Sequence, residues 1–246
     1  MIQLTEFRIL TSYKIPENAL NLKKLVIAID GPAASGKSTT SKLIAQRLGY
    51  LYVDTGAMYR AMTLKILEHK IDLDDHDAIA RVAAKTEIRL KQIDGELKVF
   101  LDGRDVSRLI RSPQVTRAVS AISMIDAVRE VMVREQRRMG KGGGVVLEGR
   151  DIGTVVFPDA DVKVYMVADV ERRARRRQKD LEKQGVEVSL DDLKIEIAER
   201  DRKDSQRSIS PLRRADDAIV VDTSDMTINE QVEVITAKAN EVLTHS

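Results

Sequence analysis

A glycine-rich segment near residue 31 has the residue types and spacing needed to hold a polyphosphate. Residues 31–38 read Gly-Pro-Ala-Ala-Ser-Gly-Lys-Ser and match the pattern G-x-x-x-x-G-K-[ST] in full. Glycines let backbone N–H groups face the phosphates, and the N-terminus of a following helix favours their negative charge. We expect Lys37 to contact the β- and γ-phosphates and Ser38 to offer its hydroxyl to Mg²⁺. This segment, the P-loop, therefore predicts a site for a nucleoside triphosphate.

Two more charged segments, 54–60 and 148–151, each follow a short apolar run. Ligands of an open parallel sheet bind beyond the carboxyl ends of its strands, so both segments are expected to border the same crevice as the P-loop. Arg60 could then clamp a second phosphate, and Asp54 could order a magnesium-bound water or the acceptor. Glu148 has the position of a carboxylate that organises Mg²⁺, directly or through water. The alternative for Arg60 is a solvated helix residue.

A third segment, 172–214, contains ten arginines and nine acidic residues. Because the signs are mixed, much of this charge is expected in i,i+4 pairs on exposed helices, worth roughly 0.2–0.5 kcal/mol each. Arg200, Asp204 and Arg207 are spaced i, i+4 and i+7, so they share one face if the helix continues. Two guanidiniums beside a carboxylate suit a phosphate and a ribose hydroxyl. We predict a mobile arginine lid that positions phosphoryl groups and excludes water.

The elements that would position these residues alternate between strand and helix. Apolar runs typical of buried parallel strands lie at 25–30, 51–53, 145–148, 162–167 and 218–221. Helices are expected at 35–48, 55–69, 112–139, 169–183, 190–204 and 228–243. This alternation predicts an α/β fold with a parallel sheet covered on both faces. Residues 87–106 differ, since two Asp-Gly turns between alternating runs indicate an inserted antiparallel hairpin or meander.

The composition of the 246 residues excludes several classes of function. There is no cysteine, which removes disulfides and thiolate metal sites, and the three histidines are scattered. A net charge of +2 and an aromatic content of 3% argue against a nucleic-acid polymer as partner. The longest apolar run, 25–29, is far below the roughly 20 residues of a membrane helix. Residues 1–22 lack signal-peptide features and are assigned no function. We expect a cytoplasmic protein that does not bind membranes.

Four segments together resemble the cytidylate kinase family, of the longer bacterial type. They are IDGPAASGKS (29–38), DTGAMYR (54–60), GRDIGTVVFPD (149–159) and ERDRKD (199–204) with Arg207. The resemblance runs from about Lys24 to the C-terminus, and residues 149–159 distinguish it from other nucleoside monophosphate kinases. It implies a P-loop nucleoside monophosphate kinase-like fold, a three-layer α/β/α arrangement with a parallel core sheet, a helical lid and an inserted acceptor-binding subdomain.

The resemblance also implies how the chain is divided and what it does. The implied parts are a core (23–56, 129–170 and 209–246), an acceptor arm (57–128, with a small sheet near 87–106) and a lid (171–208). The implied reaction is ATP-dependent phosphorylation of CMP and dCMP to CDP and dCDP, by direct in-line transfer with Mg²⁺, in pyrimidine nucleotide metabolism. ATP, CMP and dCMP are the expected partners of a monomer.

The site residues are carried over by resemblance. Those implied in catalysis are Lys37, Arg150, Arg176, Arg177 and Arg200. Those implied to bind ATP are Gly31, Pro32, Ala33, Ala34, Ser35, Gly36, Lys37, Ser38 and Thr39. Those implied to bind CMP are Asp54, Thr55, Arg60, Ser120, Arg129, Arg150, Asp151, Arg200, Asp204 and Arg207, and those implied for the metal are Ser38 and Glu148.

Within the CMP set, the family reads cytosine with Ser120, Arg129 and Asp151 and holds the phosphate with Arg60 and Arg150. Spacing does not show this independently, because nine residues along one helix would put Ser120 and Arg129 on opposite faces. Many members have Asp where this chain has Glu148.

Three other readings of the P-loop are less well supported. A guanine-reading switch protein is disfavoured because the sequence holds no Asn-Lys-x-Asp. A non-catalytic ATP-binding module would not need the acceptor arginines. A different P-loop kinase, of nucleotides or of small metabolites, is the main alternative enzyme.

Overall fold

The computed structural model describes residues 23–183, 185–207 and 209–245. The segment 1–22, to which the sequence assigned no function, lies outside the described residues. Across the three described ranges, no helix is both long enough and apolar enough to cross a membrane.

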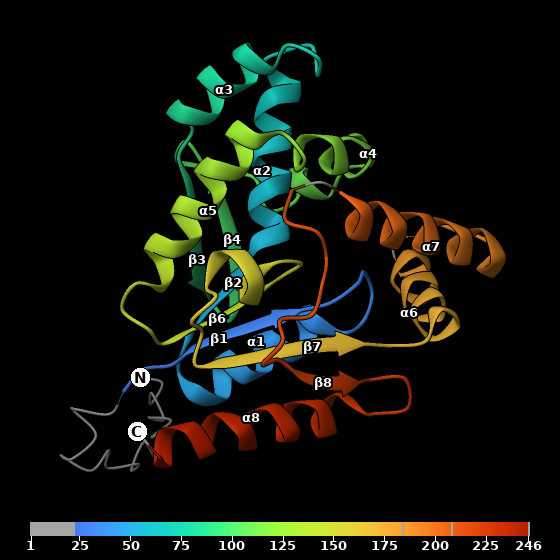
Figure 1. Ribbon diagram of the computed structural model, residues 1–246. Coiled ribbons are helices and arrows are strands. Elements are labelled where there is room, and N and C mark those ends of the chain that lie inside the picture. Colours follow the sequence, from blue (N-terminus) through green and yellow to red (C-terminus); the bar gives the residue numbers. More distant parts are fainter. Residues whose placement is uncertain (1–22, 184, 208, 246) are drawn as a thin grey trace, which may run out of the picture.

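A five-stranded parallel sheet forms the centre of the molecule (Figure 1). In spatial order its strands are β2 (Leu51–Asp54), β6 (Val145–Gly149), β1 (Val26–Asp30), β7 (Val162–Val167) and β8 (Ile219–Asp222). All of the neighbouring pairs are parallel, as the alternation of strand and helix predicts. The P-loop strand β1 is therefore central, and β6 lies directly beside it.

Helices cover both faces of this sheet, which is why its strands are apolar on both sides. Ala28 and Leu147 pack in the cluster of α2 (Thr55–Glu68) and α5 (Asp126–Gly140). Ile27, Ile29 and Val146 pack in a second cluster, on the opposite face. This second cluster includes residues of α1 (Lys37–Leu48) and α8 (Ile228–Thr244). The arrangement confirms the three-layer α/β/α prediction.

The predicted insertion at 87–106 is a three-stranded antiparallel sheet. Its strands are β3 (Ile88–Ile93), β4 (Glu96–Leu101) and β5 (Arg104–Asp105). Both Asp-Gly turns have positive φ at both residues, 52° and 75° in the first and 48° and 85° in the second. Paired positive φ angles suit a tight hairpin turn, which explains why Asp-Gly marks these positions.

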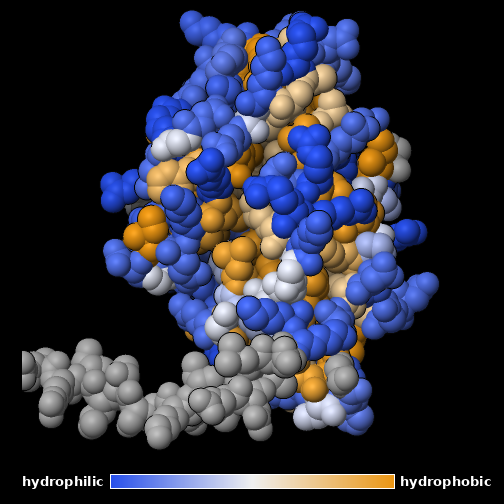
Figure 2. Space-filling model, turned by 90° about the vertical axis from the view of Figure 1, so that its left-hand side faces the viewer, coloured by the Kyte–Doolittle hydropathy of each residue, from blue (hydrophilic) through white to orange (hydrophobic). Residues whose placement is uncertain are grey.

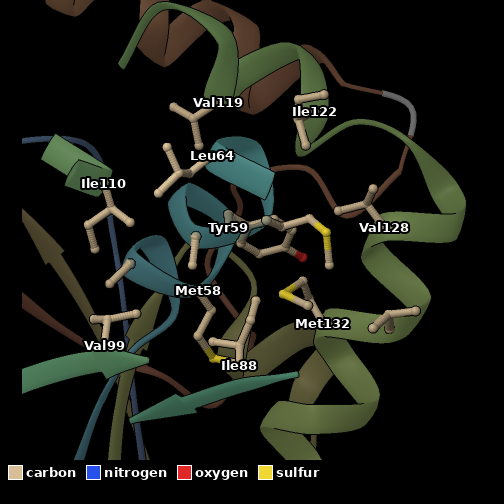
Figure 3. Close-up of a cluster of buried hydrophobic side chains, with 14 of the residues drawn as sticks. Met58, Tyr59, Leu64, Ile88, Val99, Ile110, Val119, Ile122, Val128 and Met132 are labelled. Atoms are coloured by element: carbon tan, nitrogen blue, oxygen red, sulfur yellow. The ribbon is translucent and has the colours of Figure 1, made fainter. Parts of the chain in front are cut away.

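The arm is joined to the core through one continuous apolar cluster. Figure 3 shows that Met58 of α2, Ile88 of β3, Val99 of β4 and Met132 of α5 belong to the same cluster. Val119 of α4 (Pro113–Ile122) closes the same cluster from another side. A short 3₁₀ turn (Leu109–Arg111) precedes α4.

One helix prediction in the arm is wrong, and one helix of the arm was not predicted. The single helix expected over 112–139 is two helices, α4 and α5, because the chain becomes extended at Ile125 (φ −75°, ψ 122°). No glycine or proline marks this break; Ile122 and Ile125 are both buried, and the turn lets both reach the core. A helix that was not predicted, α3 (His76–Lys85), is capped by Asp75 and buries only Ile79 and Ala83.

The segment predicted to be the lid contains α6 (Val170–Glu182) and α7 (Leu190–Gln206). The two helices share a small apolar cluster of their own, built on Ala174, Leu193 and Ile197. This cluster is separate from the two that flank the sheet, so the lid is stabilised largely by internal packing. The face of the molecule in Figure 2 is largely hydrophilic, with hydrophobic residues grouped between hydrophilic ones.

Candidate active site

The P-loop joins the end of β1 to the first turn of α1. Gly31 has a φ of 149°, and a Cβ added there would lie 2.1 Å from the carbonyl oxygen of Met166 on β7, so only glycine fits. Gly36, at the N-cap of α1, is left-handed with a φ of 99°. Within the described part of the chain, no side chain caps the first turn of α1. The N–H groups of that turn are thus available to an anion.

Lys37 lies buried across the loop. Its Nζ donates to the carbonyl oxygen of Pro32 at 2.6 Å and to Ser35 Oγ at 3.2 Å. Burial, reinforced by the nearby Arg150 charge, lowers the pKa of Lys37 to about 7. A phosphate brought to this point would favour the charged form of the lysine.

Glu148, near the end of β6, faces the first turn of α1. Ser38 Oγ donates to Glu148 Oε2 at 2.9 Å, and the Tyr52 hydroxyl donates to Glu148 Oε1. Burial, with the neighbouring Asp54 carboxylate, raises the pKa of Glu148 to about 7. Tyr52 was not among the predicted site residues. It lies two residues before Asp54 on β2, and only the pairing of β2 with β6 brings it to Glu148.

The predicted phosphate-binding arginines line one cavity of about 360 Å³ beside Lys37 and Ser38. Its polar walls include Asp54, Arg60, Arg150, Arg177, Arg200, Glu148 and Thr116. Arg60 Nη1 donates to Thr116 Oγ1 at 2.9 Å, a contact that sequence reasoning missed. Burial and the Arg150 charge lower the pKa of Arg200 to about 10. Such a group of partly desolvated guanidiniums is complementary to a phosphate.

The lid meets the core at this cavity. Arg150 Nε donates to Asp204 Oδ2 at 2.9 Å, and the two side chains are only 20% and 14% exposed. Helix α7 ends at Gln206, and Arg207 is extended, so the predicted single helical face does not include it. Arg207 nevertheless remains close to the site, with Nη2 3.8 Å from Asp151 Oδ1.

A second, smaller cavity of about 90 Å³ adjoins the first and contains the residues predicted to read the base. Ser120, Arg129, Asp151 and Arg207 line it together, with Thr55, Asp204 and Tyr59. The spacing argument, which would put Ser120 and Arg129 on opposite faces of one helix, does not apply, because the break at Ile125 places them on two helices, α4 and α5. Tyr59 is a further residue that the sequence did not indicate.

Arg129 and Asp151 form a buried ion pair through Nη2 and Oδ2, with side chains 5% and 8% exposed. Arg129 Nη1 also donates to the carbonyl oxygen of Ser123 at 3.2 Å, and its guanidinium lies 5.7 Å from the centre of the Tyr59 ring. Arg129 Nε and Arg207 Nη2 are buried without a hydrogen-bond partner among the described residues. The pocket therefore holds two carboxylates, those of Asp151 and Asp204, and unused donors, as recognition of a polar ring would require.

Arg176 lies in a different cavity from Arg177. Arg176, with residues 34–39 of the P-loop and Thr227 and Gln231 of the C-terminal segment, lines a cavity of about 480 Å³. Its guanidinium donates to the backbone oxygen and, at 3.1 Å, to the hydroxyl of Thr223. Arg177 instead lines the cavity that holds Arg60 and Arg150. The two consecutive arginines thus face the two sides of the P-loop.

Comparisons with known proteins show to which family the chain belongs. The family model described as cytidylate kinase matches residues 27–241. A cytidylate kinase of Bacillus pumilus (strain SAFR-032) is 52% identical over 208 residues, 85% of this chain and 92% of that protein. A cytidylate kinase of Bacillus thuringiensis (strain Al Hakam) is 48% identical over 213 residues, 87% and 95% of the two chains. Among solved structures, a gluconokinase from Sinorhizobium meliloti 1021 matches with a TM-score of 0.45 and 14% identity, over 92% of this chain and 97% of that one.

Proposed function

Because the chain belongs to the cytidylate kinase family, and is therefore a nucleoside monophosphate kinase, we propose that it transfers the γ-phosphoryl group of ATP to CMP and dCMP. The products are CDP and dCDP. The observation that carries the choice of base is the buried pair of Asp151 and Arg129, which shares its cavity with Ser120 and Arg207.

Cytosine presents an amino donor beside the N3 and O2 acceptors. Asp151 accepts from the amino group, while Arg129 and Ser120 donate to the ring acceptors. Uracil carries a carbonyl in place of the amino group and a proton on N3, so it sets acceptor against Asp151 and donor against Arg129. A site built on such hydrogen bonds can discriminate by up to about 10⁴–10⁵ in kcat/KM, since mismatched buried groups stay unpaired.

The phosphate of the acceptor is held by Arg60 and Arg150 in the cavity that also contains Lys37. Phosphoryl transfer depends mainly on positioning and on stabilising charge, and arginines in a partly desolvated cavity supply both. Lys37, Arg150, Arg177 and Arg200 neutralise the charge that spreads over the transferred group, while Arg176 acts from the ATP side. Closing the lid over both cavities excludes water, which would otherwise hydrolyse ATP.

Ser38 and Glu148 fit a magnesium site. Their oxygens are 2.9 Å apart on one wall of the 360 Å³ cavity. Within the described residues there is no group of three or more His, Cys, Asp or Glu residues that could hold a metal unaided. That pattern suits Mg²⁺ in kinases, which takes one or two protein oxygens and completes its shell with phosphates and water. When bound, the ion would neutralise charge on the β- and γ-phosphates.

A panel of acceptors tests the proposal. CMP, dCMP, UMP, AMP and GMP are each assayed with ATP and Mg²⁺, with kcat/KM as the readout. We expect CMP and dCMP to be used at least 10²-fold better than the others, as hydrogen-bonded base reading allows. Equal use of UMP would contradict the assignment of the base, and use of none of the five would contradict the choice of acceptor class.

We also propose that the protein acts as a monomer in the cytoplasm, in pyrimidine nucleotide metabolism. Sedimentation equilibrium with and without nucleotides tests the oligomeric state, and fractionation of cells that produce the protein tests its location.

A further inference from the structure

Tyr52 reaches Glu148 because the two residues lie on the same face of adjacent strands. In the parallel pair of β2 and β6, Tyr52 is opposite Val146 and Asp54 is opposite Glu148. Tyr52 and Val146 both pack in the cluster on the α1 face, and Glu148 is two residues beyond Val146, on that same face. The phenol ring thus runs forward along the sheet, and its hydroxyl meets the carboxylate.

The contact lies deep in the protein. Tyr52 is 4% exposed and Glu148 is 5% exposed. The hydroxyl of Tyr52 donates to Oε1, and Ser38 Oγ donates to Oε2 at 2.9 Å. Each carboxylate oxygen therefore has its own donor, and the donors come from two different elements, β2 and the first turn of α1.

Glutamate has a longer and more flexible side chain than aspartate, so a buried glutamate needs something to set its orientation. The ring of Tyr52 is held by the apolar cluster around Ile44 and Val146. Its hydroxyl therefore occupies a fixed point. A partner of this kind, which orients a ligand without touching the metal, commonly changes metal affinity 10- to 100-fold when removed.

We propose that Tyr52 is a positioning residue for the metal carboxylate: its hydroxyl fixes Oε1 of Glu148 so that Oε2 faces Ser38 and the P-loop. The inference rests on the proposed role of Glu148 at Mg²⁺. It assigns to β2, beyond the acceptor residues that follow it, a part in organising the ATP-side ion.

Binding of Mn²⁺ to the full-length protein provides the test, with no turnover required. The protein is mixed with the non-hydrolysable ATP analogue AMPPNP, and free Mn²⁺ is followed by electron paramagnetic resonance. Tyr52→Phe is expected to weaken Mn²⁺ binding to the protein–AMPPNP complex by about 10-fold or more. Its affinity for AMPPNP in EDTA is expected to stay within about two-fold of the unmodified protein, because the bare nucleotide does not use the carboxylate.

Tyr50→Phe is the matched control. It removes a hydroxyl from the same segment, one that accepts from the backbone N–H of Leu25 at 3.2 Å, away from the P-loop. We expect no change in Mn²⁺ affinity for this variant. If Tyr52→Phe changes Mn²⁺ affinity no more than Tyr50→Phe does, the inference is overturned.

Glu148→Gln separates the inference from the proposed function. If Glu148→Gln weakens Mn²⁺ binding and Tyr52→Phe does not, only the positioning role fails. If Glu148→Gln also has no effect, the proposed metal role fails with it. In the Glu148→Gln background, adding Tyr52→Phe should lower Mn²⁺ affinity by less than two-fold, since the hydroxyl acts only through the carboxylate. A full 10-fold loss in that background would show that Tyr52 acts through general damage to the fold and would overturn the inference.

Discussion

Replacing Arg129 with alanine should weaken the preference of the enzyme for CMP over UMP. The substitution removes the guanidinium that pairs with Asp151 in the small cavity, where both side chains are under 10% exposed. On the proposed function, CMP loses a donor to its ring acceptors, whereas UMP loses a group that opposes its N3 proton. The CMP/UMP ratio of kcat/KM should therefore narrow while CMP efficiency falls.

The structure sets the size of the effect. An unpaired buried hydrogen-bonding group costs roughly 1–3 kcal/mol, which corresponds to a loss of about 5- to 150-fold in kcat/KM for CMP. Breaking a buried ion pair on one side typically destabilises a protein by about 3–5 kcal/mol. Here Arg207 lies 3.8 Å from the other oxygen of Asp151, so the Asp151 carboxylate keeps one charged partner in Arg129→Ala. The loss of stability should therefore lie at the low end of the range of about 3–5 kcal/mol.

Steady-state kinetics with CMP and UMP, together with urea unfolding, measure both quantities. Arg137→Ala is the control, because Arg137 lies on the same helix and donates to the carbonyl oxygens of Val155 and Val156. It should lower stability without altering the CMP/UMP ratio. If Arg129→Ala lowered CMP and UMP use by the same factor, or by none, base reading at this position would be refuted.

Three further predictions follow from other parts of the site. Lys37→Ala should lower kcat by about 10²–10³-fold with an unchanged circular dichroism spectrum, and near-normal turnover would contradict its role at the γ-phosphate. Asp204→Asn removes the negative charge that pairs with Arg150 between lid and core, so amide exchange in 190–207 should become faster without nucleotide; unchanged exchange would show that the ion pair does not hold the lid. Asp30 is buried with its pKa raised to about 6, chiefly by burial, above an unfolded value near 3.8. Between these two values the folded state holds a proton that the unfolded state has lost. Asp30 should therefore lower the free energy of unfolding as the pH rises from about 4 to 6, and Asp30→Asn should lack this dependence on pH.

The P-loop and the core strands could be predicted because their signals are local. Leu25–Asp30 is a continuous apolar run that ends in a complete phosphate-binding motif, and the structure forms β1 and α1 at those residues. The hairpin at 87–106 was equally legible, since each Asp-Gly turn adopts the positive φ angles that its sequence favours.

The shared cavity of Ser120 and Arg129 could not be derived from spacing. Ser120 and Arg129 line one cavity only because the chain leaves the helix at Ile125, and no glycine or proline marks that break. The break is favoured by burial of Ile125, which depends on the packing of the whole arm. Helix α3 was missed for a related reason, since only two of its residues are buried and its pattern is short.

The partner of Glu148 was out of reach for a different reason. Tyr52 and Glu148 are 96 positions apart, and their contact depends on the strand order β2-β6-β1. In a parallel sheet, any of several strands can lie beside the P-loop strand, and the sequence alone does not determine which strand does. The same limit applies to Arg60 and Thr116, which are joined across two helices.

Helix α6 contributes two consecutive residues, Arg176 and Arg177, to two different cavities beside the P-loop. Successive residues of an α-helix point about 100° apart, so Arg176 and Arg177 diverge, one toward each side of the P-loop. Any rotation of this helix moves both guanidiniums together, and an occupant of one cavity that holds its arginine also sets the position of the other. A change in the orientation of this helix would therefore affect both cavities at once. On the proposed function, a nucleotide in either cavity would bias the position of this helix, and thermodynamic reciprocity would require each nucleotide to alter the affinity of the enzyme for the other by an equal factor.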